Sequence, residues 1–403
     1  DNAQLVSLYS EAFLAYGKPL YQQTVEQTLD FIERELSDIS GAFYSALDAD
    51  SEGVEGKFYI WKKEDLKVHI GKDYTLFSKY YNVNSKGFWE YGNYILLRDK
   101  SDQEFCQKEK IDLSTLEEKV SYWNAILLQE REKRVRPGLD DKSLTSWNAL
   151  MCKGYTDAYM AFGNINYLNK AIKNANFILN QQLQKNGSLW HSYKNGQSII
   201  NGFLEDYAFS IEAFMRLYEA TFDAQWLDYS EDLVSYCKRH FYDAESGMFY
   251  FTSSQDAPLV ARKMEINDNV IPASSSTMAN NLFVLGQLLG NEDYIHMAKV
   301  QLNNIKAQLP SYPSGYSNWS NLMLKTIAPF YEVAIVGKDA TSTALELYQN
   351  YQPNSLLLGS TDESDLPLLK NKMVKGQTTI YVCQNKSCQL PTTDIKQALN
   401  LIQ

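Results

Sequence analysis

Residues 143–191 read SLTSWNALMCKGYTDAYMAFGNINYLNKAIKNANFILNQQLQKNGSLWH, and this stretch shows the unit that recurs in the chain. Apolar residues follow helical spacing over 143–162 and again over 166–185, with Gly163 close to the joint. A joint this short makes two helices antiparallel neighbours. Gly187 then precedes an aromatic segment that ends in Trp190 and His191. The stretch therefore predicts a helix, a second helix and an aromatic hairpin.

The same unit recurs elsewhere in the chain. Gly17 and Gly290 mark two more short joints, and Gly41, Gly87 and Gly247 each precede further aromatic segments. The helices predicted from periodicity are 2–16, 19–37, 114–134, 143–162, 166–185, 203–222, 225–241, 274–290, 292–308 and 318–327. Paired helices with hairpins gathered at one mouth predict a mainly α fold, an (α/α)6-type toroid. A linear helical solenoid has the same periodicity and is the alternative.

The hydrophobic pattern of the sequence changes after residue 327. Short apolar runs at 332–337, 355–359 and 378–383 predict strands, and 340–350 and 393–402 predict helices. This pattern indicates a small α/β unit with a parallel sheet. The expected domains are therefore a barrel over 1–327 and the α/β unit over 328–403.

Composition excludes several classes of partner. The net charge of -11 and the lack of a basic run argue against nucleic acid. No apolar run reaches the ~18 residues of a membrane span. The first residues, Asp1-Asn2-Ala3-Gln4, read as a helix entered partway through a longer protein, without a signal segment. We expect a soluble, cytoplasmic protein.

Cysteine and histidine are sparse. The 5 cysteines are scattered, so reduced thiols are expected. Cys383 and Cys388, close together after an apolar run, are the exception: two unlinked thiols is the favoured interpretation, and a metal or redox pair is the alternative. With only 4 histidines, a His-rich metal site is nearly excluded. We expect no metal and no cofactor.

Residues 44–61, YSALDADSEGVEGKFYIW, hold four acids between aromatic residues. Gly53 and Gly56 permit a tight reversal, so 43–45 and 57–61 are predicted to pair as a hairpin with the acids at its tip. Asp48 and Asp50 are candidate substrate-binding residues. The spacing resembles a calcium loop, but Tyr59 stands where that loop needs a Glu. A solvated acidic turn and a structural metal site that also includes Glu52 are the alternatives.

Residues 134–148, RVRPGLDDKSLTSWN, place two acids before a helix start. Capping explains one of Asp140 and Asp141, and a nearby arginine could keep the other ionised as a base or nucleophile. Trp147 and Asn148 follow as candidate substrate-binding residues.

A second acid pair, Glu205 and Asp206, opens the helix predicted over 203–222. The helix dipole favours acids there, which is the simpler explanation; the functional one is that an acid faces the barrel axis. His191 is a candidate proton carrier or only a packed side chain. Three further substrate-binding candidates are Trp190, Tyr207 and Asp268.

The motifs FYSALDADSEGVEGKFYIW, RVRPGLDDKSLTSWNAL, LEDYAF and YVCQNKSCQLP together resemble the thioredoxin-domain proteins related to spermatogenesis-associated protein 20. This resemblance implies a six-hairpin barrel similar to glycosidases and N-acylglucosamine 2-epimerases. It also implies an N-terminal thioredoxin-like module, absent from this chain, as a partner, and a barrel that lacks its first hairpin. Gly138 stands where the family commonly has His, which puts a His-dependent epimerase mechanism in doubt.

These residues predict a carbohydrate-active or carbohydrate-binding barrel with carboxylate acid/base chemistry at its mouth, because sugars offer hydroxyls to acids and apolar faces to aromatic rings. A glycosidase-like pair would be Asp141 with Glu205 or Asp206. A non-catalytic scaffold serving the thioredoxin-like module is the alternative.

Overall fold

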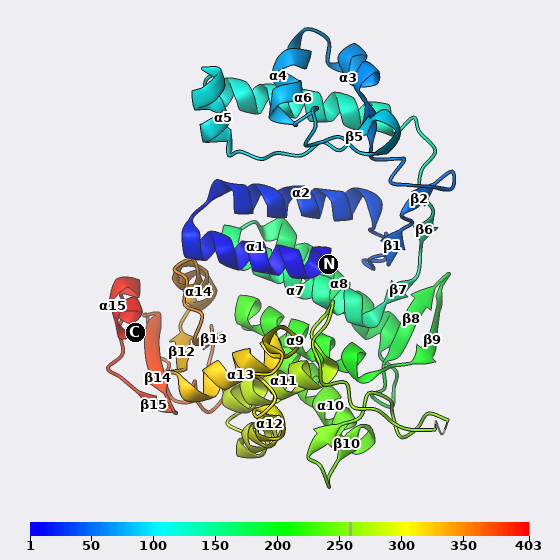
Figure 1. The fold of residues 1–403 in the computed structure, drawn as a ribbon. Helices are drawn as coiled ribbons and strands as arrows, with labels where there is room; N and C mark the ends of the chain where they lie inside the picture. The colour runs from blue at the N-terminus through cyan, green and yellow to red at the C-terminus, as the bar shows by residue number, and fades with distance from the viewer. Residues whose placement is uncertain (258–259, 403) are drawn as a thin grey trace. The chain divides into compact units, whose positions relative to one another are not determined.

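The computed structural model describes residues 1–257 and 260–402 (Figure 1). Its contacts divide the chain into two units. Unit 1 comprises Asp1–Ser45 and the chain from Asp141 onward, and unit 2 comprises Ala46–Asp140. The expected boundary at residue 327 is a different division and stays a prediction. Within the described ranges, none of the helices has the length and apolarity needed to cross a bilayer.

Unit 1 is built from an inner and an outer layer of helices. The inner helices are α1 (Asn2–Tyr16), α7 (Thr145–Phe162), α9 (Leu204–Thr221), α11 (Ser274–Leu289) and α13 (Ser317–Ile327), and each packs on the next. The outer helices α2 (Pro19–Glu35), α8 (Ile165–Phe177), α10 (Gln225–His240) and α12 (Glu292–Ile305) each pack on the inner helix before them. Alternation of inner and outer helices confirms the (α/α) toroid and the helix pairs predicted from periodicity.

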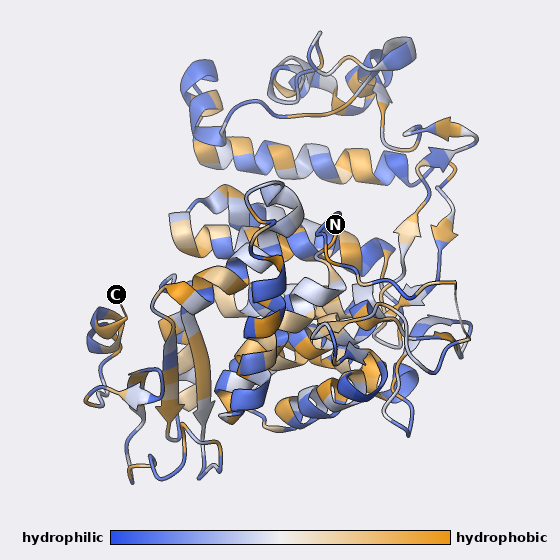
Figure 2. Cartoon of the chain, turned by 60° about the horizontal axis from the view of Figure 1, so that its bottom comes forward, coloured by the Kyte–Doolittle hydropathy of each residue, from blue (hydrophilic) through white to orange (hydrophobic). Residues whose placement is uncertain are grey.

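Residue pattern explains which helices lie inside. Helix α7 is buried on almost every side, whereas α8 and α10 bury one stripe and expose the other. Figure 2 shows this alternation of hydrophobic and hydrophilic residues along the surface helices.

The dipeptide Gly-Asn makes two of the helix joints. Gly163 ends α7 at φ 71°, where a side chain would be strained, and its N–H bonds to Tyr159 O. Asn164 then caps α8 by accepting from Asn166 N. Gly290 and Asn291 repeat this arrangement between α11 and α12.

Helix ends differ from prediction by one to three residues at most joints, but α8 departs further. The segment predicted as helix to 185 leaves α geometry after Phe177 and continues as the π-turn η3 (Ile178–Gln182). Gln182 is fully buried there, and its Nε2 donates to Thr145 Oγ1 at the start of α7. The wider turn directs this side chain to the helix start, which periodicity does not reveal.

Short hairpins precede the inner helices. Strands β7 (Ser143–Leu144), β8 (Trp190–Lys194) and β9 (Gln197–Asn201) form one antiparallel sheet, and β10 (Tyr242–Asp243) pairs with β11 (Met248–Phe249). The aromatic segments after Gly187 and Gly247 therefore lie in hairpins, as predicted.

The hairpin predicted between 43–45 and 57–61 is wrong. Phe43 bridges Ser37, whereas β4 (Trp61–Lys62) pairs with β5 (Asn93–Tyr94). The acidic stretch contains a tighter hairpin, β2 (Asp50–Ser51) with β3 (Val54–Glu55), and β1 (Ala46–Leu47) pairs with β6 (Leu139–Asp140). Glu52 takes a positive φ together with Gly53, so the reversal needs only two residues.

Unit 2 has a hydrophobic core of its own around Trp61, Phe77, Phe105, Leu116 and Trp123. Its helices are α3 (Lys63–Ile70), α4 (Tyr74–Tyr80), α5 (Asp102–Glu109) and α6 (Leu113–Arg131), with 3-10 turns η1 (Gly71–Asp73) and η2 (Glu90–Gly92). Only α6 is predicted from sequence. The others span two turns or so, too few for a clear periodic pattern.

The C-terminal sheet has the order β13-β12-β14-β15. Its strands are β12 (Tyr331–Val336), β13 (Ser355–Ser360), β14 (Thr379–Gln384) and β15 (Ser387–Cys388), with α14 (Ala340–Tyr348), α15 (Ile395–Leu401) and the 3-10 turn η4 (Pro313–Tyr316) nearby in sequence. The α/β pattern is confirmed, but the sheet is mixed rather than parallel. Helix α14 crosses over between the parallel strands β12 and β13. The helix-free link 361–378 instead starts β14 at the end of the sheet where β13 finishes, on the other side of β12, so β14 runs antiparallel to β12.

A charged cavity of about 600 Å³ lies among the inner helices of unit 1. Asp157 lies on its wall with its side chain 2% exposed, and it binds Lys153 Nζ at 2.8 Å and Arg216 Nε at 2.6 Å. Burial alone would raise the pKa of Asp157, but the two cations lower it to about 2. The carboxylate thus links α7 to α9 through Arg216.

We expect Asp157→Ala to destabilise unit 1 by roughly 3–5 kcal/mol, because it leaves two buried cations without their anion. Urea unfolding at pH 7 measures this change. The matched control is Asp365→Ala, which removes an exposed ion pair with Lys370 and is expected to change stability by less than ~1 kcal/mol. Equal losses in the two variants would contradict the role of Asp157.

Candidate functional site

Three ionisable side chains meet where α9 begins. His191 lies on β8, and Glu205 and Asp206 lie in the first turn of α9. One nitrogen or oxygen atom of each lies within 4.8 Å of the others. The turn at Gly202 brings strand and helix together, since Gly202 N bonds to Leu189 O and a Cβ at residue 202 would meet that oxygen at 2.7 Å.

Asp206 is fully buried and holds this site together. Its Oδ1 accepts from Ser146 N at 2.9 Å, and its Oδ2 accepts from Phe203 N at 2.9 Å. Its Oδ2 also lies 2.9 Å from His191 Nδ1. One carboxylate therefore joins the start of α7, the start of α9 and strand β8. With so many partners, Asp206 positions other groups rather than reacting itself.

His191 is a partly buried base whose charge is supported by its neighbour. Burial alone would lower its pKa, but the hydrogen bond and negative charge of Asp206, with Glu205 nearby, raise it above the ordinary value. The imidazole also packs on Phe203, with ring centroids 4.9 Å apart. Because Nδ1 faces Asp206, Nε2 is the nitrogen left for other partners.

Glu205 is the acid whose proton affinity suits proton transfer. Burial, followed by the charges of Asp206 and Glu265, raises its pKa to about 7. Ser146 Oγ donates a long hydrogen bond of 3.4 Å to Glu205 Oε1. At neutral pH the carboxyl therefore exists in both protonated and ionised forms, as a general acid/base requires.

Among the residues that the structure describes, His191, Glu205 and Asp206 form the one group of side chains close enough together to bind a metal ion. Their donor atoms are partly engaged, because both Asp206 oxygens accept backbone N–H bonds and His191 Nδ1 faces Asp206. The acidic stretch of unit 2 forms no such group within the described ranges. There Asp48 Oδ1 accepts from Asp50 N, and Glu52 pairs with Lys57.

The remaining predicted acids lie in other surroundings. Asp141 is partly exposed and binds Lys194 Nζ at 2.5 Å, which lowers its pKa through that hydrogen bond. Asp140 lies in β6, where it pairs with Ala46 of β1. Both strands belong to unit 2, as do Asp48 and Asp50. Asp268 is buried: its Oδ1 accepts from Ala273 N and its Oδ2 from Asn318 N, at the starts of α11 and α13.

Two predicted ligand-binding residues, Tyr207 and Asn148, have their polar atoms engaged within the fold. Tyr207 is fully buried, stacks on Tyr236 and accepts from Leu189 N through its hydroxyl, so its ring is closed to a ligand. Asn148 is buried and bonds to both backbone groups of Phe43. Trp190 O accepts from Thr145 Oγ1. Trp147 is exposed.

Sequence reasoning missed Ser146 and Glu265. Ser146 contacts both acids, by its N–H and its hydroxyl. Glu265 raises the pKa of Glu205 and accepts from Ser274 N at the start of α11. The sequence does show a serine at the start of one helix, Ser146, and an acid shortly before another, Glu265. It does not show which helix starts lie next to each other in the fold, so these two residues could not be assigned to the site.

Fold and site together define a helical toroid with an acid–base cluster at the N-terminal ends of its inner helices. No protein-family model matches the chain. The chain is 27% identical to human spermatogenesis-associated protein 20 over 440 residues. The alignment covers 98% of this chain and 56% of that protein. An uncharacterised protein of Caenorhabditis elegans is 26% identical over 452 residues, covering 98% and 60%. The resemblance stated from the motifs is thus confirmed, and the chain spans little more than half the length of these relatives.

Solved structures with a similar course of the chain were also found. A sugar epimerase from a ruminal bacterium is 12% identical, with 76% of this chain and 59% of that chain covered and a TM-score of 0.46. A GH76 alpha-mannanase of Bacteroides thetaiotaomicron is 13% identical, with 87% and 72% covered and a TM-score of 0.46. These similarities by themselves assign no activity to the chain.

We expect Asp206→Asn to lower the pKa of His191, since the substitution removes the hydrogen bond and the negative charge that support the imidazolium. Titration of the His191 ring resonances by NMR measures the shift. Asp141→Asn is the matched control, because that carboxylate is paired with Lys194. An unchanged His191 titration in Asp206→Asn would contradict the pairing.

The raised pKa of Glu205 also predicts a pH-dependent cost to stability. The folded state disfavours the ionised form, so the cost begins as pH rises above the ordinary value of 4.5 and is complete above about 7. We therefore expect Glu205→Gln to stabilise the protein by roughly 1–3 kcal/mol at pH 8 and to have little effect at pH 4. Urea unfolding at both pH values tests this; a loss of stability at pH 8 would show that Glu205 is favourably ionised.

Proposed function

We propose that unit 1 is a carbohydrate-active domain in which Glu205 and His191 transfer protons to and from a bound sugar. The observation that carries this proposal is a carboxyl with a pKa of about 7 beside a histidine held by a buried carboxylate. Two groups that both exchange protons near neutral pH can serve as acid and base on one substrate. Asp206 positions His191 and keeps it basic.

The surroundings of the cluster support a polyhydroxylated ligand. Ser146 Oγ and the carboxyl of Glu205 offer a hydrogen-bond donor and acceptor to sugar hydroxyls. Trp147, exposed beside Ser146 in the first turn of α7, offers an apolar face of the kind that packs on a sugar ring. Within this proposal Trp190 remains a candidate for binding. Asp141, predicted as a catalytic acid, is assigned to binding instead, because it is paired with Lys194.

Two reaction types fit the same residues. In an epimerase or isomerase, one group removes the proton next to the sugar carbonyl and the other returns it. In a glycosidase, protonated Glu205 donates to the leaving oxygen while a second carboxylate assists. Glu265 is a candidate for that carboxylate, because its charge acts on Glu205. The Gly138 departure does not weaken the first type, because His191 supplies an imidazole.

A thermal-shift screen of mono- and disaccharides identifies the ligand, because a sugar that binds the folded state raises Tm. With that sugar, we expect Glu205→Gln to lower kcat by ~10²–10⁴-fold. Wild-type kcat/KM, which reports the pKa of the free protein, should fall as pH rises through about 7 if protonated Glu205 is the acid. Proton exchange with D₂O at carbon identifies an epimerase, and release of a reducing end identifies a glycosidase.

The matched control is Glu231→Gln, an exposed glutamate on outer helix α10, which should retain wild-type turnover. Turnover unchanged by Glu205→Gln would refute the assignment. No sugar binding at all would favour the alternative, a scaffold serving the thioredoxin-like module. One observation supports that alternative: Asp206 and Asp268 both accept hydrogen bonds from backbone N–H groups, and a purely structural role would explain these bonds.

A further inference from the structure

Cys383 and Cys388 form a disulfide on the outer hairpin of the C-terminal sheet. The sequence-based interpretation as two unlinked thiols is therefore wrong. Strands β14 and β15 are joined by Asn385 and Lys386, both at positive φ, and this two-residue turn places the cysteines directly opposite each other. Spacing alone does not fix such a register. Cys106, Cys152 and Cys237 remain free thiols.

The two sulfurs differ in access. Cys383 lies in the inner strand β14 and is 1% exposed, whereas Cys388 lies in edge strand β15 and is exposed. The chain from Gln384 to Pro391 is exposed throughout, so the strand that carries Cys388 is open to solvent. An incoming thiolate therefore reaches Cys388 first.

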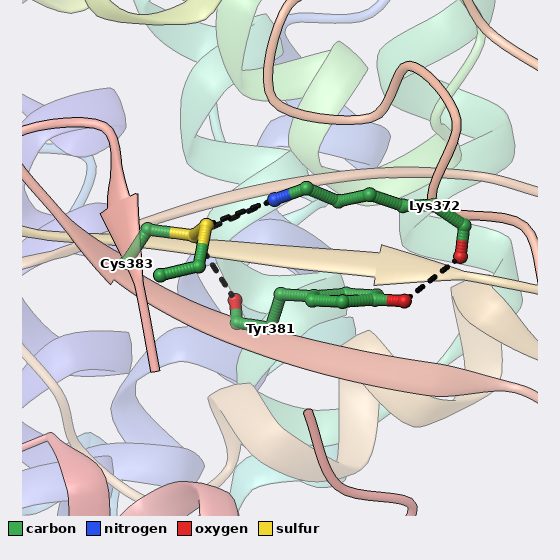
Figure 3. The surroundings of a disulfide bond; sticks show 4 residues. Lys372, Tyr381 and Cys383 are labelled. Atoms are coloured by element: carbon green, nitrogen blue, oxygen red, sulfur yellow. Dashed lines mark hydrogen bonds between the residues drawn. A yellow bond between two sulfur atoms is a disulfide. The ribbon is translucent and has the colours of Figure 1, made fainter. Parts of the chain in front are cut away.

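A lysine lies against both sulfurs (Figure 3). Lys372 Nζ is 2.8 Å from Cys388 Sγ and 3.8 Å from Cys383 Sγ. Tyr381 holds this lysine in place: its hydroxyl donates to Lys372 O at 3.0 Å, and its ring lies 4.7 Å from the ammonium. Partial burial lowers the pKa of Lys372. A fixed cation beside a sulfur stabilises the thiolate and so favours its departure from a disulfide.

A buried carboxyl lies opposite the buried sulfur. Glu332 on β12 pairs directly with Cys383 on β14, so both side chains are on the same face of the sheet. Glu332 is 1% exposed, and its Oε2 has no hydrogen-bond partner. Burial raises the pKa of Glu332 despite the neighbouring Lys386 and Lys372. The raised pKa favours the protonated form of Glu332, and the pairing of β12 with β14 puts this carboxyl on the same side of the sheet as a thiolate released on Cys383.

We propose that the Cys383–Cys388 hairpin is a thiol–disulfide exchange site that accepts two electrons from an external dithiol. A thiolate of the dithiol attacks Cys388 Sγ; the bond between the two cysteines breaks, and its electron pair leaves on Cys383 Sγ, which takes a proton from Glu332. The second thiolate of the dithiol then attacks its own mixed-disulfide sulfur, and the electron pair leaves on Cys388 Sγ beside Lys372. The dithiol departs as a disulfide, and solvent restores the proton to Glu332.

Reduction of the folded protein by dithiothreitol tests the proposal, with native alkylation and mass spectrometry counting two newly accessible thiols. We expect Lys372→Met to slow reduction by about three- to tenfold, from the dependence of exchange rates on the leaving thiol. Lys372→Arg keeps the charge and should restore most of the rate. The matched control is Lys370→Met, since Lys370 lies in the same segment but pairs with Asp365; it should react like wild type.

Glu332→Gln provides an independent readout should a lysine variant fold poorly. It is expected to slow reduction without lowering Tm, because the amide keeps the shape of the carboxyl but donates no transferable proton. A second experiment compares two reductants at equal dithiol concentration: dithiothreitol and a reduced protein that carries a C-x-x-C pair. The reductant that reduces the Cys383–Cys388 disulfide faster is the one that the site favours. Wild-type reduction rates in Lys372→Met, or a folded protein that dithiothreitol leaves oxidised, would overturn the proposal.

Discussion

Buried carboxylates that bind the backbone at helix starts hold the inner layer of unit 1 together. Asp206 accepts from the N–H groups of Ser146 and Phe203, at the starts of α7 and α9. Asp268 accepts from Ala273 and Asn318, at the starts of α11 and α13. Helix starts carry unpaired N–H groups and a partial positive charge, so one buried anion between two of them satisfies both.

This constraint also creates the candidate site. Burial raises the pKa of Glu205, and the negative charge of the neighbouring Asp206 at the helix start raises it further, to about 7. His191 is drawn to the same anion and gains proton affinity. The structural carboxylate thus tunes an acid and a base beside it, although its own oxygens are occupied by the fold.

The proposed acid–base site and the disulfide hairpin use the same physical means in separate parts of unit 1. In each, a buried carboxyl and a basic side chain lie near a group that is less buried: Glu205, which is partly buried, in one and Cys388, which is exposed, in the other. The disulfide depends on the C-terminal sheet, where β14 reverses beside β12 and brings Glu332 opposite Cys383. The helices of the inner layer set the first site, and the strand register sets the second.

Local chemistry in the sequence determined the helix pairs, their joints and the acids at helix starts, because helical periodicity, glycine at positive φ and capping act within a few residues. Gly163 and Asn164 are one case, and Glu205 and Asp206 before an apolar helix are another. Only the tertiary structure decided that Asp206 accepts the backbone N–H of Ser146, 60 residues away, while Glu205 receives only a long bond from the Ser146 hydroxyl and has a raised pKa. It likewise decided the pairing of Trp61 with Tyr94, the reversal of β14 and the bond between Cys383 and Cys388. These depend on which distant segments pack together, and sequence spacing does not encode that choice locally.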